Sequence, residues 1–419
     1  MDKRKLVLDA INHRQPEAVP RDFGSTSVTG IHCSLVAELR DYYGLEKRLV
    51  KVFEPFSFLG MVDDDLSEAL GSSTGFVLPL ASVFGGSTDR WKEWRTPWGQ
   101  EVLIPADFGI KYDANGDVLA YPQGDMSAPP SGKMPKSSYF IDVLIRQEDF
   151  EDEDLDPKDN TEEFQPMSDE TVRAIVEKCR IARATGKGVV FQMPGTALGD
   201  ISKVPAPGLK HPKGIRDIEE WYISLSLRPD YVRSVLEIQA EVGLENIKKI
   251  HQAGGDDLCD VIHLCGTDFG TQNSTFCSHE TLESVFAPSY RKLCGWIHDN
   301  TPWKIFKHTC GSVEPFIQPL LDMGFDILNP VQCSAANMDP RMLKEKYGDK
   351  ITFWGGGIDT QRVLPFGTPK EVREQVLERL EIFSPGGGFM FATIHNTQAR
   401  TPLANFVAMI DALNEFDGL

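Results

Sequence analysis

The stretch WKIFKHTCGSVEPFIQPLLDMGFDILNPVQ, residues 303–332, contains the repeating unit from which we derive the fold. It begins with an apolar run (303–311), continues with an amphipathic segment (313–324) and ends with a second apolar run (325–332). A strand, a helix and a second strand over about 30 residues form a βαβ unit, in which the two strands are parallel. The stretch therefore predicts a parallel sheet covered by helices.

The same alternation extends through most of the chain from about residue 168 onward. Four more apolar runs are typical of buried strands, at 186–195, 259–266, 351–357 and 388–395. Segments with helical periodicity, several of them starting at Ser, Thr or Asp, are found at 168–185, 228–254, 278–300, 339–348 and 368–383. Two strand candidates, 18–26 and 74–80, occur in the first third.

Eight such runs predict an α/β protein with the (β/α)8 TIM barrel fold. An open, doubly wound sheet is the alternative. The turn QMPGTALGD (192–200) lacks the GxGxxG pattern of nucleotide-binding folds, which favours the barrel.

The region before residue 168 contains features that do not fit the barrel repeat. Residues 86–140 are rich in Trp, Gly and Pro and include an Asn-Gly turn at 115–116, which predicts β-hairpins. Residues 146–163 are strongly acidic and predict a solvated linker. We therefore predict one barrel domain over 1–419, with an N-terminal β-hairpin elaboration and acidic linker at 86–165 over the barrel mouth.

The composition excludes several classes of protein. With 62 acidic and 43 basic residues, the formal charge is -19, which disfavours nucleic acid and anionic membranes as partners. The N-terminus lacks the apolar core of a signal peptide, and no apolar run reaches the length of a membrane span. The eight cysteines form no CxxC pair, which predicts reduced thiols in a cytoplasmic protein.

In a barrel of this type, the active site lies at the carboxyl ends of the strands. Polar residues follow nearly every predicted strand: Asp22, Thr196, Asp200, Asp268, Gln272, His308, Cys310, Gln332, Cys333, Asp359, Gln361, His395 and Asn396. His308 and Cys310 share one face of an extended chain, so both can bind one ion. Zinc accepts imidazole and thiolate ligands, typically three from the protein at a catalytic site. The third ligand is predicted to be His395, with Cys333 as the alternative.

Three C-terminal segments resemble the uroporphyrinogen decarboxylase superfamily, and within it the zinc-dependent, corrinoid-linked methyltransferases. They are HTCGSVEPFIQPLLDMGFDILNPVQ (308–332), ITFWGGGIDTQRVLPFGTPKEVREQV (351–376) and PGGGFMFATIHNTQARTPLANFVAMIDA (385–412). The resemblance covers most of the chain from about residue 168 and extends weakly to VPRDFGSTSVTGIH (19–32). It implies a (β/α)8 barrel, in agreement with the strand count.

The resemblance also implies a cofactor and a reaction. In this branch, an HxC pair and a distant Cys bind zinc, and the metal activates a methyl acceptor, often a thiol. His308 and Cys310 match the pair, whereas His395 stands where the distant Cys is expected. A neutral imidazole in place of a thiolate leaves a more Lewis-acidic metal. Tetrahydrofolate is therefore at least as plausible an acceptor as a thiol such as coenzyme M.

The implied co-substrate is methylcobalamin on a corrinoid protein, and the second partner is a small methyl acceptor; we also allow for a homodimer. Four strand-end residues are predicted to orient the acceptor or a metal ligand: Asp268, Gln272, Gln332 and Asp359. Three are predicted to line the cofactor site: Met193, Trp354 and Asn396. Plain core packing is the alternative for Met193 and Trp354.

Two other functions stay open at this point. One is a cofactor-independent decarboxylase like uroporphyrinogen decarboxylase, although the N-terminal region carries only Arg21 and lacks the Arg-rich RQAGR-type motif of those enzymes. The other is a barrel that binds a ligand without catalysis, because fold does not fix function.

Overall fold

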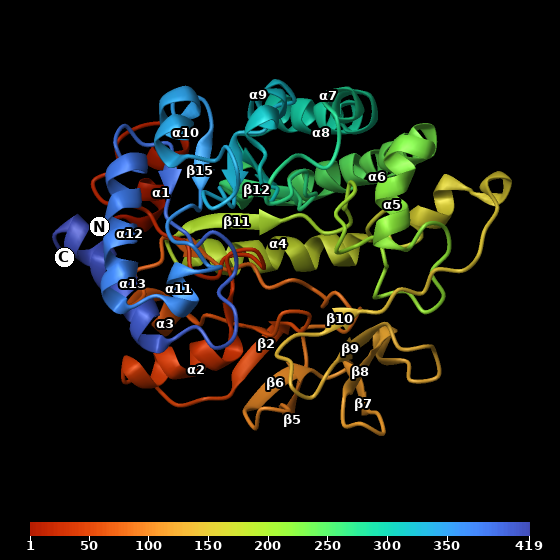
Figure 1. The fold of residues 1–419 in the computed structure, drawn as a ribbon, viewed down its shortest axis with the longest axis horizontal. Coiled ribbons are helices and arrows are strands. Elements are labelled where there is room, and N and C mark those ends of the chain that lie inside the picture. Colours follow the sequence, from red (N-terminus) through yellow and green to blue (C-terminus); the bar gives the residue numbers. More distant parts are fainter.

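The structure is a computed structural model that describes residues 1–419 (Figure 1). Its central element is a seven-stranded parallel sheet, in the order β16-β15-β14-β13-β12-β11-β4. The strands are β4 (Thr74–Gly75), β11 (Gly188–Gln192), β12 (Val261–Cys265), β13 (Lys304–His308), β14 (Ile327–Asn329), β15 (Thr352–Trp354) and β16 (Phe389–Met390). Each strand predicted from residue 186 onward is confirmed, and 74–80 contributes β4.

The segment around Arg21 links the two edges of this sheet. Arg21 forms a parallel bridge with Phe391 beside β16, and Phe391 N–H donates to the Pro20 carbonyl at 2.8 Å. On the other side, Ser73 N–H donates to the Arg21 carbonyl at 2.7 Å, next to β4. The strand candidate 18–26 thus lies where the eighth strand of a barrel is expected. The fold is a TIM-like α/β structure.

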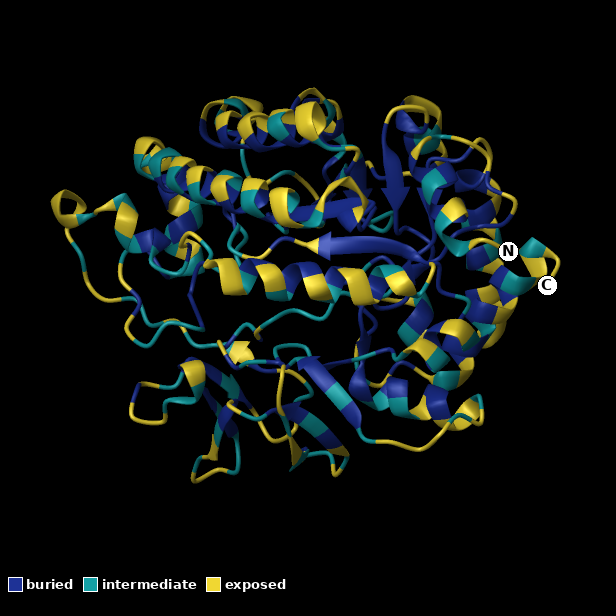
Figure 2. Ribbon diagram, turned by 180° about the vertical axis from the view of Figure 1, so that it is seen from behind, coloured by how far each residue is buried: buried dark blue, intermediate teal, exposed yellow.

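Helices cover the outside of the sheet, and their exposed faces point away from it (Figures 1 and 2). From residue 169 onward they are α4 (Asp169–Ala184), α5 (Ile218–Leu227), α6 (Pro229–Gly254), α7 (His279–Thr281), α8 (Ala287–Asn300), α9 (Glu314–Asp322), α10 (Pro340–Tyr347), α11 (Val363–Phe366), α12 (Pro369–Phe383) and, after the last strand, α13 (Leu403–Asp417). Several start with a side-chain cap, and α12 has a full capping box between Thr368 and Glu371. The predicted helices are confirmed to within a few residues, except that 278–300 divides into α7, the π-helical turn Leu282–Phe286 and α8.

The inner face of the sheet has its own apolar core. One residue from each of β11 to β16 belongs to this cluster, which comprises Val190, Val261, Phe306, Ile327, Trp354 and Met390 along with neighbours. Val7, Ala10 and Ile11 of α1 (Lys3–Ile11) join it and pack at one end of the strands. Because side chains alternate along a strand, Phe306 pointing inward means that His308 also points inward.

The chain before residue 168 adds two smaller sheets and two helices, α2 (Cys33–Tyr42) and α3 (Asp64–Ala69). One sheet contains β1 (Ile31–His32), β3 (Leu59–Gly60), β2 (Val50–Glu54), β6 (Glu101–Pro105) and β5 (Trp91–Arg95). The other contains β10 (Asp142–Val143), β9 (Gly132–Met134), β8 (Val118–Tyr121) and β7 (Gly109–Tyr112). The predicted Asn-Gly turn joins β7 to β8, with Gly116 at a φ of 82°. No helix is long and apolar enough to cross a bilayer.

Candidate metal centre

His308, Cys310 and His395 gather at the carboxyl ends of the strands. His308 is the last residue of β13, Cys310 follows two residues later, and His395 lies in the loop after β16. One ligand atom from each lies within 4.8 Å of the other two. His308 Nε2 is 3.4 Å from Cys310 Sγ, and the two imidazole centroids are 5.4 Å apart. Two distant segments of the chain thus supply three ligand atoms to one point.

Each imidazole is held by an asparagine. His308 Nδ1 lies 2.5 Å from Asn329 Oδ1, and His395 Nδ1 lies 3.0 Å from Asn396 Oδ1. Both amides are fixed because their Nδ2 groups donate to backbone carbonyls, those of Trp354 (2.7 Å) and Ser27 (3.2 Å). The amide oxygen accepts, so the proton is on Nδ1 and the Nε2 lone pair is free.

Burial sets the charge of these groups. Desolvation, with a smaller contribution from nearby His308, lowers the pKa of His395 to about 4, so this imidazole is neutral at pH 7. Burial raises the pKa of the Cys310 thiol well above its ordinary value, and the Asp268 carboxylate adds to the rise. A cation at this point would offset that rise, because a coordinated thiol is deprotonated.

Asp268, from the loop after β12, supports the loop that carries Cys310. Its Oδ1 accepts a hydrogen bond from Cys310 N–H at 2.7 Å and lies 3.9 Å from His308 Nε2. The carboxylate therefore fixes the position of the thiol while remaining at the edge of the ligand group.

Two glutamines continue this support. Gln332 Oε1 accepts from Gly311 N–H at 2.8 Å, and Gln332 Nε2 donates to Gln272 Oε1 at 3.0 Å. Gln272 Nε2 in turn donates to the Ser334 carbonyl at 2.5 Å. Gly311 has a φ of 88°, and a Cβ there would lie 2.3 Å from the Gly270 carbonyl carbon. The tight turn after Cys310 therefore requires glycine.

Asp359, Trp354 and Met193 are not part of the group of three ligands. Asp359 Oδ1 accepts hydrogen bonds from the backbone N–H groups of Gln361 (2.7 Å) and Arg362 (3.1 Å). Asp359 therefore stabilises the loop to which it belongs. Trp354 is fully buried in the inner core, with its indole N–H donating to Asp22 at 3.0 Å. Met193 is buried, and its N–H donates to the His263 carbonyl at 2.9 Å. Their predicted roles in catalysis or cofactor binding stay predictions.

Two residues at this site carry no prediction from the sequence. Asn329 pairs in register with His308 on the adjacent parallel strand, a signal that the predicted strands 303–311 and 325–332 already contained. Tyr222 is on α5, a helix without a prediction. Its hydroxyl is buried without a partner, and burial, together with the Asp268 carboxylate, raises the pKa of this hydroxyl. No sequence motif marks Tyr222.

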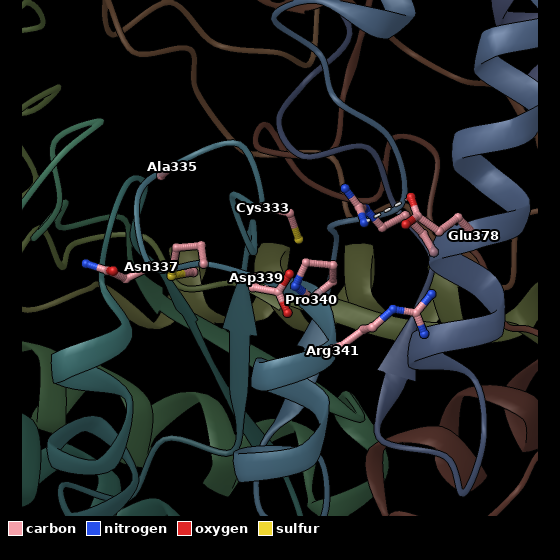
Figure 3. Close-up of a pocket in the computed structure, with 9 residues that line it drawn as sticks. Cys333, Ala335, Asn337, Asp339, Pro340, Arg341 and Glu378 are labelled. Atoms are coloured by element: carbon pink, nitrogen blue, oxygen red, sulfur yellow. Dashed lines mark hydrogen bonds and ion pairs between the residues drawn. The ribbon is translucent and has the colours of Figure 1, made fainter.

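Cys333, the alternative third ligand, is not part of the ligand group. It lines a separate cavity of about 430 Å³ between the loop before α10 and the helix α12 (Figure 3). Burial raises the pKa of its thiol to about 12. Gln332 therefore contacts the loop that carries Cys310, at Gly311, whereas its neighbour Cys333 faces the cavity.

The fold and the ligand group together define a TIM-like α/β protein with a mixed imidazole and thiol site at the strand ends. Residues 210–416 match the family model described as uroporphyrinogen decarboxylase (URO-D). Through this C-terminal half the chain belongs to the URO-D family, and the family resemblance seen in the sequence is confirmed.

Among solved structures, the chain is similar to a methyltransferase from Methanosarcina mazei, with 16% identity, a TM-score of 0.55 and 99% of each chain covered. At this identity the likeness concerns the fold alone, which the two chains share over nearly their full length. An endoglucanase, Cel5A of Pseudomonas stutzeri, aligns over 58% of this chain and 74% of its own with 12% identity and a TM-score of 0.29, too low to support an argument. No curated protein matches the chain.

Proposed function

We propose that this protein is a zinc-dependent methyltransferase that moves a methyl group between a methylated corrinoid protein and a small acceptor, tetrahydrofolate or a thiol. The proposal takes the sheet as a closed (β/α)8 barrel whose eighth strand is the segment around Arg21. The observation that carries it is the convergence of His308, Cys310 and His395 within 4.8 Å at the strand ends.

The three residues fit zinc by chemistry and by distance. With Zn–N near 2.0–2.1 Å and Zn–S near 2.3 Å, tetrahedral ligands N and S lie about 3.6 Å apart. His308 Nε2 and Cys310 Sγ are 3.4 Å apart. Two imidazoles and one thiolate form a borderline-soft set that suits zinc. The ion would leave a fourth position open and supply Lewis acidity to the acceptor there.

The surrounding residues then have defined tasks. Asn329 and Asn396 hold the two imidazoles with Nε2 toward the site, and Asp268 holds the loop of the thiol. A methylated corrinoid bound as substrate would supply the methyl group to the acceptor at the strand ends, and the acceptor would release its N–H or S–H proton to solvent. The Tyr222 hydroxyl, buried without a partner, is available to hydrogen-bond the acceptor.

The charge of the ligand set indicates how the metal would activate an acceptor. One thiolate and two neutral imidazoles leave a net positive charge on a divalent ion, whereas an added thiolate would cancel it. This favours activation of an acceptor through Lewis acidity, which suits the nitrogen of tetrahydrofolate as well as a thiol.

The decarboxylase alternative receives less support. Binding an octa-anionic porphyrinogen requires free arginines, but the guanidinium of Arg21 is engaged elsewhere. It forms a buried ion pair with Asp417 at 2.6 Å and donates to Asn414 Oδ1 at 2.8 Å, both on α13. Arg21 therefore secures the C-terminal helix rather than a substrate.

The test is a methyl-transfer assay with zinc-loaded protein, methylcobalamin, and tetrahydrofolate or a thiol, followed by the absorbance of cob(I)alamin. We expect demethylation with one acceptor class and its loss in His308→Ala. If no acceptor is methylated while the protein releases carbon dioxide from uroporphyrinogen, the decarboxylase reading replaces ours. If neither reaction occurs, the protein is a non-catalytic barrel.

A further inference from the structure

Asp200, in the loop after β11, brings a second carboxylate to the metal centre, in addition to that of Asp268. Its Oδ1 accepts hydrogen bonds from the N–H (2.9 Å) and the hydroxyl (2.7 Å) of Ser202, whereas its Oδ2 has no hydrogen-bond partner. A Cβ at Gly266 would lie 2.8 Å from Asp200 Oδ2 and 3.7 Å from His308 Cδ2. The free carboxylate oxygen and the edge of a ligand imidazole therefore approach the same point.

The charge of Asp200 reaches the thiol ligand and a neighbouring tyrosine. Burial is the main cause of the raised pKa of both the Cys310 thiol and the Tyr222 hydroxyl, and the carboxylates of Asp268 and Asp200 raise both pKa values further. Tyr222 stacks on Phe276, with ring centroids 4.6 Å apart, and its hydroxyl is buried without a partner. Asp200, Asp268 and Tyr222 thus border one region beside Cys310.

The chain supplies no cationic partner to these two carboxylates. No lysine or arginine forms an ion pair with Asp200 or Asp268. The ammonium of the fully buried Lys307 donates to a backbone carbonyl at 2.8 Å. Lys203, from the same loop as Asp200, acts on Glu54, whose pKa is raised by burial and lowered in part by this ammonium. The region beside the thiol therefore has an excess of negative charge.

A zinc ion bound by the three ligands would not remove this excess. The negative charges of the Cys310 thiolate and of the two carboxylates together exceed the two positive charges of the ion, and neutral imidazoles add none. An ammonium group next to the fourth position would restore the balance. It has three N–H donors, for which Asp200 Oδ2 and the Tyr222 hydroxyl oxygen are free acceptors. A sulfonate or carboxylate at the same place would be repelled by like charges.

We propose that the methyl acceptor is a small molecule with an ammonium group beside its nucleophile, and that Asp200 selects it by binding this ammonium. The inference rests on the proposed function, since it concerns the acceptor at the open position of the metal. Asp200 is then a specificity-determining residue that contacts the substrate, through a charge-assisted hydrogen bond. An amino thiol fits this description, whereas a thiol with an anionic group does not.

The test is isothermal titration calorimetry of the zinc-loaded full chain with three small thiols of different charge. They are cysteamine, a cation, 2-mercaptoethanol, which is neutral, and 2-mercaptoethanesulfonate, an anion. We expect cysteamine to bind at least tenfold more tightly than 2-mercaptoethanol, and the sulfonate to bind most weakly. Asp200→Asn retains the acceptor for Ser202 but removes the charge, so it should lower the ratio of cysteamine to 2-mercaptoethanol affinity at least tenfold. Because the thiols differ in acidity, this change of ratio between the two proteins is the decisive quantity.

Asp125→Asn is the matched control. Asp125 forms the same turn, in which its Oδ1 accepts from the N–H and the hydroxyl of Ser127, but it belongs to the N-terminal elaboration and pairs with Lys210. Its affinity ratio should equal that of the wild type. If the folding of Asp200→Asn is impaired, the charge series of the wild type decides alone.

Three results would overturn the inference and leave the proposed function standing. They are a wild type that does not prefer cysteamine, an unchanged ratio in Asp200→Asn, and an equal loss of preference in Asp125→Asn. If none of the thiols binds, the inference is overturned too, whereas methyl transfer to tetrahydrofolate by the same protein would still support the proposed function.

Discussion

Replacing Asn329 by Ala tests whether the asparagines tune the metal site. Asn329 is fully buried, accepts from His308 Nδ1 and donates to the Trp354 carbonyl. Without it, His308 loses the partner that fixes its tautomer. Loss of such a partner typically lowers metal affinity 10- to 100-fold, about 1.4–2.7 kcal/mol. Two buried groups also lose their partners, which lowers the free energy of unfolding by about 2–4 kcal/mol.

The control for this variant is Asn405→Ala. Asn405 is also buried and donates to two backbone carbonyls, of Leu364 and Gly367, each at 2.8 Å. It contacts no metal ligand, so its removal should reduce stability to a similar degree and leave zinc affinity unchanged. Zinc dissociation constants are measured by competition with a chromophoric chelator, and stability by urea unfolding. The reasoning is refuted if Asn329→Ala loses stability but binds zinc as tightly as Asn405→Ala.

Three further predictions follow from contacts outside the ligand group. The hydrogen bond with Asp326 raises the pKa of His298 in the folded protein. This hydrogen bond therefore stabilises the fold fully below about pH 6.5, and the stabilisation is lost as the pH rises through the pKa of His298 in the folded state. His298 is partly exposed, so we expect a loss below about 1 kcal/mol, visible as a falling urea midpoint that His298→Gln abolishes. Cys333→Ala should leave zinc stoichiometry unchanged, as metal analysis can check; loss of zinc would restore Cys333 as a ligand. Asp22→Ala should lower the free energy of unfolding by at least about 3 kcal/mol in urea unfolding, because Ser25, Thr74 and Trp354 all donate to this buried carboxyl group. A change below about 1 kcal/mol would show that these three hydrogen bonds do not stabilise the fold.

The periodicity of the sequence was sufficient for the parallel strands and most helices, because buried strands and amphipathic helices have different apolar spacing. It failed for α5, whose residues are apolar around much of the helix and so show little periodicity. Before residue 168, the sequence predicted hairpins but not the two small sheets, because pairings such as β2 with β6 join segments that are distant in the chain.

The convergence of His308, Cys310 and His395 could be predicted because strand ends converge in a barrel, which brings His395 to His308 without any local motif. The supporting residues were harder to predict. Gln272 and Gln332 were expected near the site, but their contact with each other depends on loop conformation. Trp354 shows the limit of strand-end reasoning: it is the last residue of β15, yet its side chain points into the inner core.

The most direct test of the metal centre is metal analysis of the purified protein combined with X-ray absorption at the zinc edge. We predict about one zinc per chain, with one sulfur near 2.3 Å and nitrogen ligands near 2.0–2.1 Å. Both the metal and the sulfur signal should disappear in Cys310→Ala. A folded protein that takes up no zinc, or binds it without a sulfur ligand, would contradict the site built from His308, Cys310 and His395.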